Sequence, residues 1–118
     1  MNEFFKDLGF EIIEIPPTEE DREKYQFNYW KRFTEAEKDG IEAVYQTFNE
    51  IVRECHEAAK PYVNLTELYI IANHKMWEHR KTNVALAKHY NDMQCAGYEY
   101  ITNHFTPEEL NYFYLKTD

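Results

Sequence analysis

The stretch IEAVYQTFNEIVRECHEAA, residues 41–59, decides the fold class. Its apolar side chains recur every three or four residues, which is the period of one face of an α-helix. The face comprises Ile41, Val44, Tyr45, Phe48, Ile51, Val52, Cys55 and Ala59. Gly40 precedes the stretch and Pro61 follows it, and both residues interrupt helices. We therefore expect one amphipathic helix here, with its apolar face in a core.

A second helix is expected upstream, from the segment EIPPTEEDREKYQF (residues 14–27). Its two prolines stop the preceding segment, and Thr18 with Asp21 or Glu20, three or two residues later, resembles a helix start. The acids that follow face the positive end of the helix dipole. The helix is expected to end at a break near Asp39-Gly40. Aromatic residues recur at helical spacing along it, namely Tyr25, Tyr29 and Phe33, and Phe27 and Trp30 widen this stripe.

Three further helices are expected downstream. Asn64 and Glu67 have capping-box spacing, which predicts a helix from Asn64 to about His79. Thr82 or Asn83 then caps a helix that runs to about His104, and TPEEL (106–110) begins a short final helix. The predicted inward positions are Leu65, Leu68, Ile71, Ala72, Met76, Leu86, Tyr90, Met93, Gly97, Tyr100, Ile101, Leu110, Phe113 and Tyr114.

These patterns predict an all-α protein. The connections are short, so we expect a compact antiparallel bundle of four main helices plus short terminal helical pieces. At 118 residues the chain is expected to form a single domain, residues 1–118. Phe4, Phe5 and Leu8 predict one helical turn, and FEIIEI (10–15) predicts an extended segment.

The chain shows neither a membrane-spanning apolar run nor a signal-peptide pattern at its start, which predicts a cytoplasmic protein without membrane contact. The two cysteines, Cys55 and Cys95, are too few for a disulfide scaffold. Both lie in helical patterns, and we expect buried, reduced thiols.

Catalytic signatures are missing from the sequence. There is no serine, and the three glycines form neither a phosphate loop nor a dinucleotide fingerprint. Cys55 and His56 are adjacent, but neighbours on a helix point about 100° apart. Four histidines could belong to a metal site: His74, His79, His89 and His104. The sequence contains no H-E-x-x-H or Glu-x-x-His spacing that would support such a site. We predict no catalytic residue, no metal and no cofactor.

Charge is distributed unevenly along the chain. The net charge is −9, and residues 1–59 carry 15 acids against 7 bases. Such a surface repels nucleic-acid phosphates, so direct nucleic-acid binding is not expected. An ordinary solvated face is one interpretation. The other is a partner-binding surface for a basic protein, made of Glu19, Glu20, Asp21, Glu23, Glu42, Glu50, Glu54 and Glu57.

The aromatic residues admit two interpretations. Ten tyrosines and eight phenylalanines could form a stacking platform for single-stranded nucleic acid, but the cations that such platforms need are scattered. Core packing is the expectation for Tyr45, Phe48, Trp77 and Phe113, and some tyrosines also suit a protein interface.

The second half of the chain resembles a known group of proteins. LTELYIIANHKMWEH, LAKHYNDM and ELNYFYLKTD, within residues 65–118, look like small accessory proteins carried by prophages and conjugative elements of gut anaerobes. That class includes anti-CRISPR inhibitors, some of which are similar to DNA in charge. The resemblance implies an inhibitor of a CRISPR effector, and it carries over no functional residue.

Two functional hypotheses follow. The first is a non-enzymatic inhibitor that presents the acidic residues to a basic nucleic-acid-handling protein, acting as a DNA mimic. The alternative is a helical interaction module or mobile-element regulator that self-associates, as a homodimer burying Trp30 or Tyr112.

Overall fold

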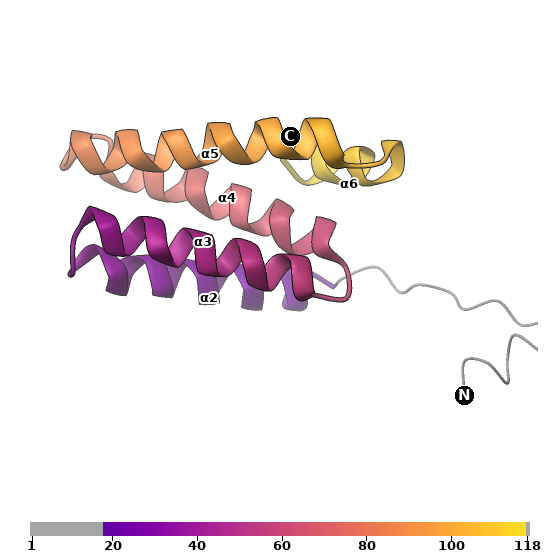
Figure 1. Cartoon of the computed structure of the whole chain (residues 1–118), viewed down its shortest axis with the longest axis horizontal. Coiled ribbons are helices and arrows are strands. Elements are labelled where there is room, and N and C mark those ends of the chain that lie inside the picture. Colours follow the sequence, from indigo (N-terminus) through magenta and orange to yellow (C-terminus); the bar gives the residue numbers. More distant parts are fainter. Residues whose placement is uncertain (1–17, 118) are drawn as a thin grey trace, which may run out of the picture.

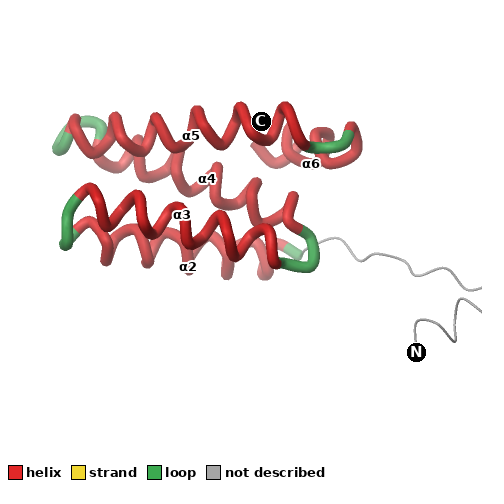
Figure 2. Tube along the Cα trace, in the orientation of Figure 1, coloured by secondary structure: helices red, strands yellow, loops and turns green. Residues whose placement is uncertain are grey.

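A computed structural model of the chain describes residues 18–117, and within them all regular structure is helical (Figures 1 and 2). The described part contains five helices: α2 (Glu19–Glu37), α3 (Ile41–Glu57), α4 (Pro61–His79), α5 (Val84–His104) and α6 (Pro107–Thr117). The predicted all-α class is confirmed. The helical turn and extended segment expected in the first fifteen residues lie outside the described part.

The start of α2 follows the predicted chemistry. The Thr18 hydroxyl accepts a hydrogen bond from the Asp21 backbone N–H at 3.1 Å, and the Asp21 carboxylate accepts one from the Thr18 N–H at 3.3 Å. The break before α3 is confirmed at Gly40, which has a φ of 108°. L side chains rarely adopt this left-handed backbone, so glycine is the residue that fits there.

The predicted start of α4 is wrong. The helix begins at Pro61, three residues before Asn64, because proline is well suited to a first helical turn. Asn64 instead donates its amide to the Tyr29 hydroxyl at 3.0 Å. Glu67 is fully buried and accepts hydrogen bonds from α2, so its spacing from Asn64 is not a capping box.

The last two helices begin as predicted. Asn83 caps α5 by accepting a hydrogen bond from the Leu86 N–H at 3.2 Å. Thr106 and Glu109 form a reciprocal pair at the start of α6, with distances of 3.0 and 3.3 Å. These side chains satisfy backbone N–H groups that have no partner inside a helix.

Helix α4 is the centre of the structure, since it contacts α2, α3, α5 and α6 (Figure 1). α2 lies beside α3 and α4 beside α5, each pair joined by a short turn. Phe33 of α2 meets Tyr90 of α5 edge to face at 5.5 Å, and both are fully buried. The rest of the core cluster is Tyr29, Ala36, Val44, Ile51, Cys55, Leu65, Leu68, Ile71, Leu86 and Met93.

Some side chains expected to be buried are exposed instead: Ala59, Trp77, Cys95, Tyr100 and Tyr114, together with Phe27 and Trp30 of the ring stripe in α2. Trp77 lies near the end of α4, whereas α6 packs near the beginning of that helix (Figure 1). The Arg80 guanidinium lies over the Trp77 ring, 4.5 Å from its centroid.

None of the described helices combines the length and apolar character that a membrane span requires.

Candidate functional site

The eight acidic residues predicted to bind a partner are all exposed: Glu19, Glu20, Asp21, Glu23, Glu42, Glu50, Glu54 and Glu57. We call them the acidic set. Their side chains project from α2 and α3, the helices that lie side by side on one flank of α4.

The acidic set gathers mainly at one end of the molecule. The beginning of α2 and the end of α3 lie together there, and Asp21 shares a shallow pocket with Ala58 and Lys60 (Figure 1). Glu42 stands apart, in the first turn of α3 at the opposite end. Glu50, in the middle of α3, lines a hollow with Asp39 and Ala43 beside the α2–α3 turn. The structure therefore brings six members of the acidic set toward one end and leaves Glu42 and Glu50 separate from them.

Arg32 neutralises part of this surface. Its guanidinium donates two parallel hydrogen bonds to the Glu54 carboxylate, at 2.8 and 2.7 Å, and lies 3.9 Å from Glu50. The hydrogen bond from Arg32 lowers the pKa of Glu54 below its usual range. Two members of the acidic set are thus tied to α2, and their charges are partly offset.

The first turns of α2 contain weaker pairs. Arg22 contacts Glu19 at 2.9 Å, and Lys24 contacts Glu20 at 3.5 Å. Exposed pairs of this kind contribute between about 0 and 1 kcal/mol. The remaining surface carboxylates, Glu23, Glu42 and Glu57, form no ion pair or hydrogen bond with any other described residue.

A buried carboxylate lies behind this surface. Glu67 of α4 accepts hydrogen bonds from Arg22 Nε at 3.0 Å and Gln26 Nε2 at 2.7 Å, both on its Oε1 atom. Its other oxygen has no partner among the described residues. Burial raises the pKa of Glu67 despite these two hydrogen bonds. The cluster fixes α2 against α4 and withdraws Arg22 from solvent.

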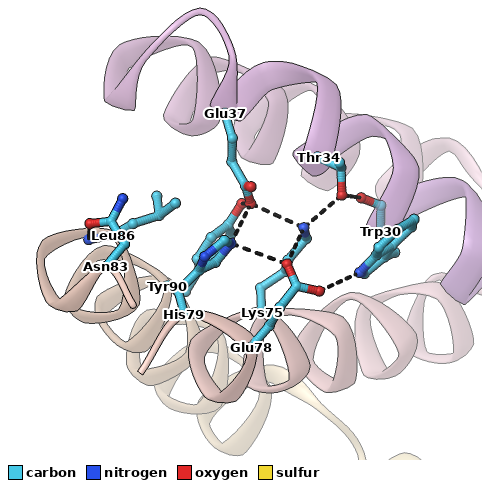
Figure 3. Close-up of polar contacts among 9 residues, drawn as sticks. All are labelled: Trp30, Thr34, Glu37, Lys75, Glu78, His79, Asn83, Leu86 and Tyr90. Atoms are coloured by element: carbon cyan, nitrogen blue, oxygen red, sulfur yellow. Dashed lines mark hydrogen bonds and ion pairs between the residues drawn. The ribbon is translucent and has the colours of Figure 1, made fainter. Parts of the chain in front are cut away.

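The largest polar network surrounds Lys75, whose side chain is fully buried (Figure 3). Its ammonium donates to the Thr34 hydroxyl at 2.6 Å and to Glu78 Oε2 at 3.0 Å, and it lies 3.1 Å from Glu37 Oε2. A buried ammonium requires such partners, because unpaired burial of a charge is very costly. The network joins α2 to α4.

Helix α5 enters the same network through Tyr90. Its hydroxyl donates to Glu37 Oε2 at 2.5 Å, and the His79 ring stacks on the Tyr90 ring at 6.0 Å (Figure 3). Burial and the Glu37 carboxylate together raise the pKa of Tyr90 above its usual range. Glu37 therefore links α2 to both α4 and α5.

Trp30 of α2 contacts two members of the Lys75 network. Its indole N–H donates to Glu78 Oε1 at 3.0 Å, and its ring lies 4.9 Å from the Lys75 ammonium (Figure 3). Burial acts to raise the pKa of Glu78, but the hydrogen bonds from Trp30 and Lys75 outweigh it and lower that pKa.

Three of these side chains have the donor atoms of a metal site. Glu37, Glu78 and His79 each place one such atom within 4.8 Å of the others. Lys75 lies among them and already supplies the positive charge that the two carboxylates require. The arrangement is a complete ion-pair cluster, which holds three helices together.

Sequence reasoning named Trp30, His79 and Tyr90 but gave no structural role to Lys75 or Glu37 of this network. Lys75 falls three and four residues after Ala72 and Ile71 in the apolar stripe of α4. That position was the available signal. Its partner Glu37 carries no comparable signal, because the contact depends on how α2 packs against α4.

No family model matches the chain, and no curated protein or solved structure shows significant similarity to it.

Proposed function

We propose that this protein is a non-enzymatic inhibitor that binds a basic nucleic-acid-handling protein through the acidic set. The observation that carries the proposal is the exposure of all eight carboxylates, in contrast to the half-buried Arg22 and Arg32 beside them. The guanidinium groups of Arg22 and Arg32 are held between carboxylates of their own chain. The carboxylates of the acidic set that lack such a pair, Glu23, Glu42 and Glu57, remain available to a basic partner.

The spacing of these groups supports a DNA-like surface. Carboxylates three and four residues apart on a helix lie about 5–6 Å from one another. Like charges at this spacing destabilise the free helix slightly, and a cationic groove relieves that repulsion. Long-range attraction between opposite fields also raises the rate of association.

The partner we propose is a CRISPR effector in the cytoplasm, an assignment that rests on the resemblance to accessory proteins of prophages and conjugative elements. An inhibitor of this kind occupies a cationic nucleic-acid channel and performs no reaction. Neither a cofactor nor direct nucleic-acid contact is part of the proposal.

Charge reversal at the acidic end tests the proposal. We would replace Glu20, Glu23 and Glu57 with lysine and measure binding to purified CRISPR effectors, with and without guide RNA, over a salt series. The control replaces Asp92, Glu99 and Glu108 with lysine, because these exposed acids give the same charge change elsewhere. We expect loss of binding in the first variant only. Affinity that is independent of salt, or equal loss in both variants, contradicts the proposal.

The second candidate function is self-association through exposed aromatic side chains. Phe27 and Trp77 expose 63% and 57% of their surface, which exceeds what most large apolar residues expose. Trp30 is also exposed, but Tyr112 packs against Tyr62 with ring centroids 5.2 Å apart. Light scattering of the wild-type chain and of a Trp77→Ala variant distinguishes the candidates, since only a dimer that buries Trp77 is weakened by the substitution.

We further propose that α2–α5 form one antiparallel four-helix unit and that the chain is a single domain. The Lys75 network, which ties three of these helices together, supports this proposal. A single unfolding transition, coincident by circular dichroism and tryptophan fluorescence, is the expected result. Two separate transitions would refute it.

A further inference from the structure

A groove lies between α3, α4 and α5, away from the acidic set. α3 and α5 touch each other at few places, although both pack against α4. The space between them has a volume of about 220 Å³. Its floor is formed by Leu65, Leu68 and Ala72 of α4, and its walls include Phe48 and Val52 of α3 and Met93 of α5.

The two ends of this groove carry contacts between aromatic and histidine rings. Toward one end the Tyr45 hydroxyl lies 2.7 Å from His89 Nδ1 and joins α3 to α5. Toward the other end His56 meets Tyr100 edge to face at 5.5 Å, and His104 stacks on Tyr100 at 4.1 Å. The groove is therefore a bounded site, open mainly on one side.

Gly97 keeps the site open. It lies in the interior of α5, where glycine is destabilising by about 0.5–1 kcal/mol relative to alanine. No tight contact requires it, because a Cβ atom built on Gly97 would come no closer than 3.8 Å to the Tyr69 ring. Its missing side chain adds to the space inside the groove, and nothing else in the described structure accounts for glycine at this position.

We propose that this groove binds a small planar molecule with an aromatic body and one hydrogen-bonding group. An apolar cavity of about 150 Å³ accommodates benzene, so a somewhat larger space suits a bicyclic ring system. A peptide helix needs a much longer apolar surface than this site offers. Asn49 and His56 on the α3 wall are exposed side chains that form no hydrogen bond with another described residue, and in this proposal they bind the polar group at the solvent side of the ligand.

The test uses indole as the probe and the full chain as the protein. The chain has only three glycines, so the Gly97 amide is easily assigned in a proton–nitrogen correlation spectrum. We expect saturable shifts of this amide, with a dissociation constant at or below about 1 mM. 1-Methylindole, which lacks the N–H group, should bind at least about threefold more weakly, and a His56→Phe variant should remove part of that difference.

A Gly97→Leu variant fills the groove and should abolish binding of indole. Ala85→Leu is the matched control, because Ala85 is an exposed residue of the same helix. If the Gly97→Leu chain fails to fold by circular dichroism, Ala96→Leu at the edge of the groove gives the same test. Absence of saturation at about 10 mM indole, or equal binding in the filled and control variants, overturns the proposal. Neither result depends on the acidic set, so the proposed inhibitor function is tested separately.

Discussion

The Lys75 ammonium lies 3.1 Å from the Glu37 carboxylate, and this contact joins two helices whose residues are far apart in the sequence. Both groups also bind a third helix or a neighbouring side chain, since Tyr90 donates to Glu37 and Lys75 donates to Thr34. The centre of this helical protein thus contains a polar network around Lys75, in addition to the buried Glu67 cluster and the apolar core.

Removing the charge of Lys75 should destabilise the fold strongly. Lys75→Met preserves the volume of the side chain but leaves Glu37 and Glu78 facing each other without a cation. We expect a loss of about 2–4 kcal/mol in the free energy of unfolding, measured in urea. Lys31→Met, at an exposed lysine, should change it by less than about 0.5 kcal/mol.

Restoring charge balance should recover part of that loss. Adding Glu37→Gln to the Lys75→Met variant removes one of the two uncompensated carboxylates. If the double variant is as unstable as the sum of the two single variants, Lys75 and Glu37 act independently and the proposed coupling between them is wrong.

The stability of the protein should depend on pH through Glu78. Its pKa in the folded state is lowered, so its contribution is fully present above the unfolded value of about 4.3 and is lost as the pH falls through the folded pKa. Glu78→Gln should therefore reduce the slope of unfolding free energy against pH below about pH 4.3.

Glu67 serves as the comparison for this titration because its pKa is shifted in the opposite direction. Burial raises its folded pKa, so its ionised form opposes folding as the pH rises above about 4.3. The stability of Glu67→Gln relative to the wild type should thus change with pH in the opposite sense to that of Glu78→Gln. Parallel pH profiles for the two variants would contradict this assignment.

Two glycine substitutions should have opposite effects. Gly97→Ala places a methyl group in ordinary contact with the Tyr69 ring, at 3.8 Å, and should stabilise the protein by about 0.5–1 kcal/mol. Gly40→Ala forces alanine into a positive φ and should destabilise it by about 1–3 kcal/mol. Thermal unfolding of both variants measures the difference, and a stabilised Gly40→Ala chain would mean that the turn before α3 has another conformation.

Releasing the carboxylates held by Arg32 should strengthen binding to a basic partner. Arg32→Gln frees both Glu50 and Glu54 and should cost no more than about 1 kcal/mol in stability. Lys31→Gln changes the net charge equally but frees no carboxylate. We expect a larger gain in affinity from Arg32→Gln, measured by titration at low salt. Equal gains would show that only the overall charge matters.

The local features of the fold were predictable from the sequence. The caps at Thr18, Asn83 and Thr106 use short-range hydrogen bonds, and each fixes a helix start within a few residues. The start of α4 was predicted wrongly because Glu67, which looked like the partner of a cap at Asn64, is instead bound by α2 across 45 and 41 positions of the sequence.

The state of the acidic set was only partly predictable. Exposure follows from helical periodicity, so all eight residues were placed correctly on the surface. The pairing of Arg32 with Glu54 depends on the register between α2 and α3, which local spacing does not determine. The burial of Lys75 likewise depends on α2 covering one face of α4.

The two cysteines differ in their exposure to solvent, and this difference makes their alkylation a measure of how fast the chain opens. Cys55 is fully buried beside the Tyr29 hydroxyl, and burial raises the pKa of its thiol to about 11, whereas Cys95 is open to solvent. An alkylating reagent at neutral pH reacts with the thiolate form, so it should modify Cys95 at once and Cys55 only when the chain opens. The second modification therefore reports the rate of opening without any added label or engineered residue.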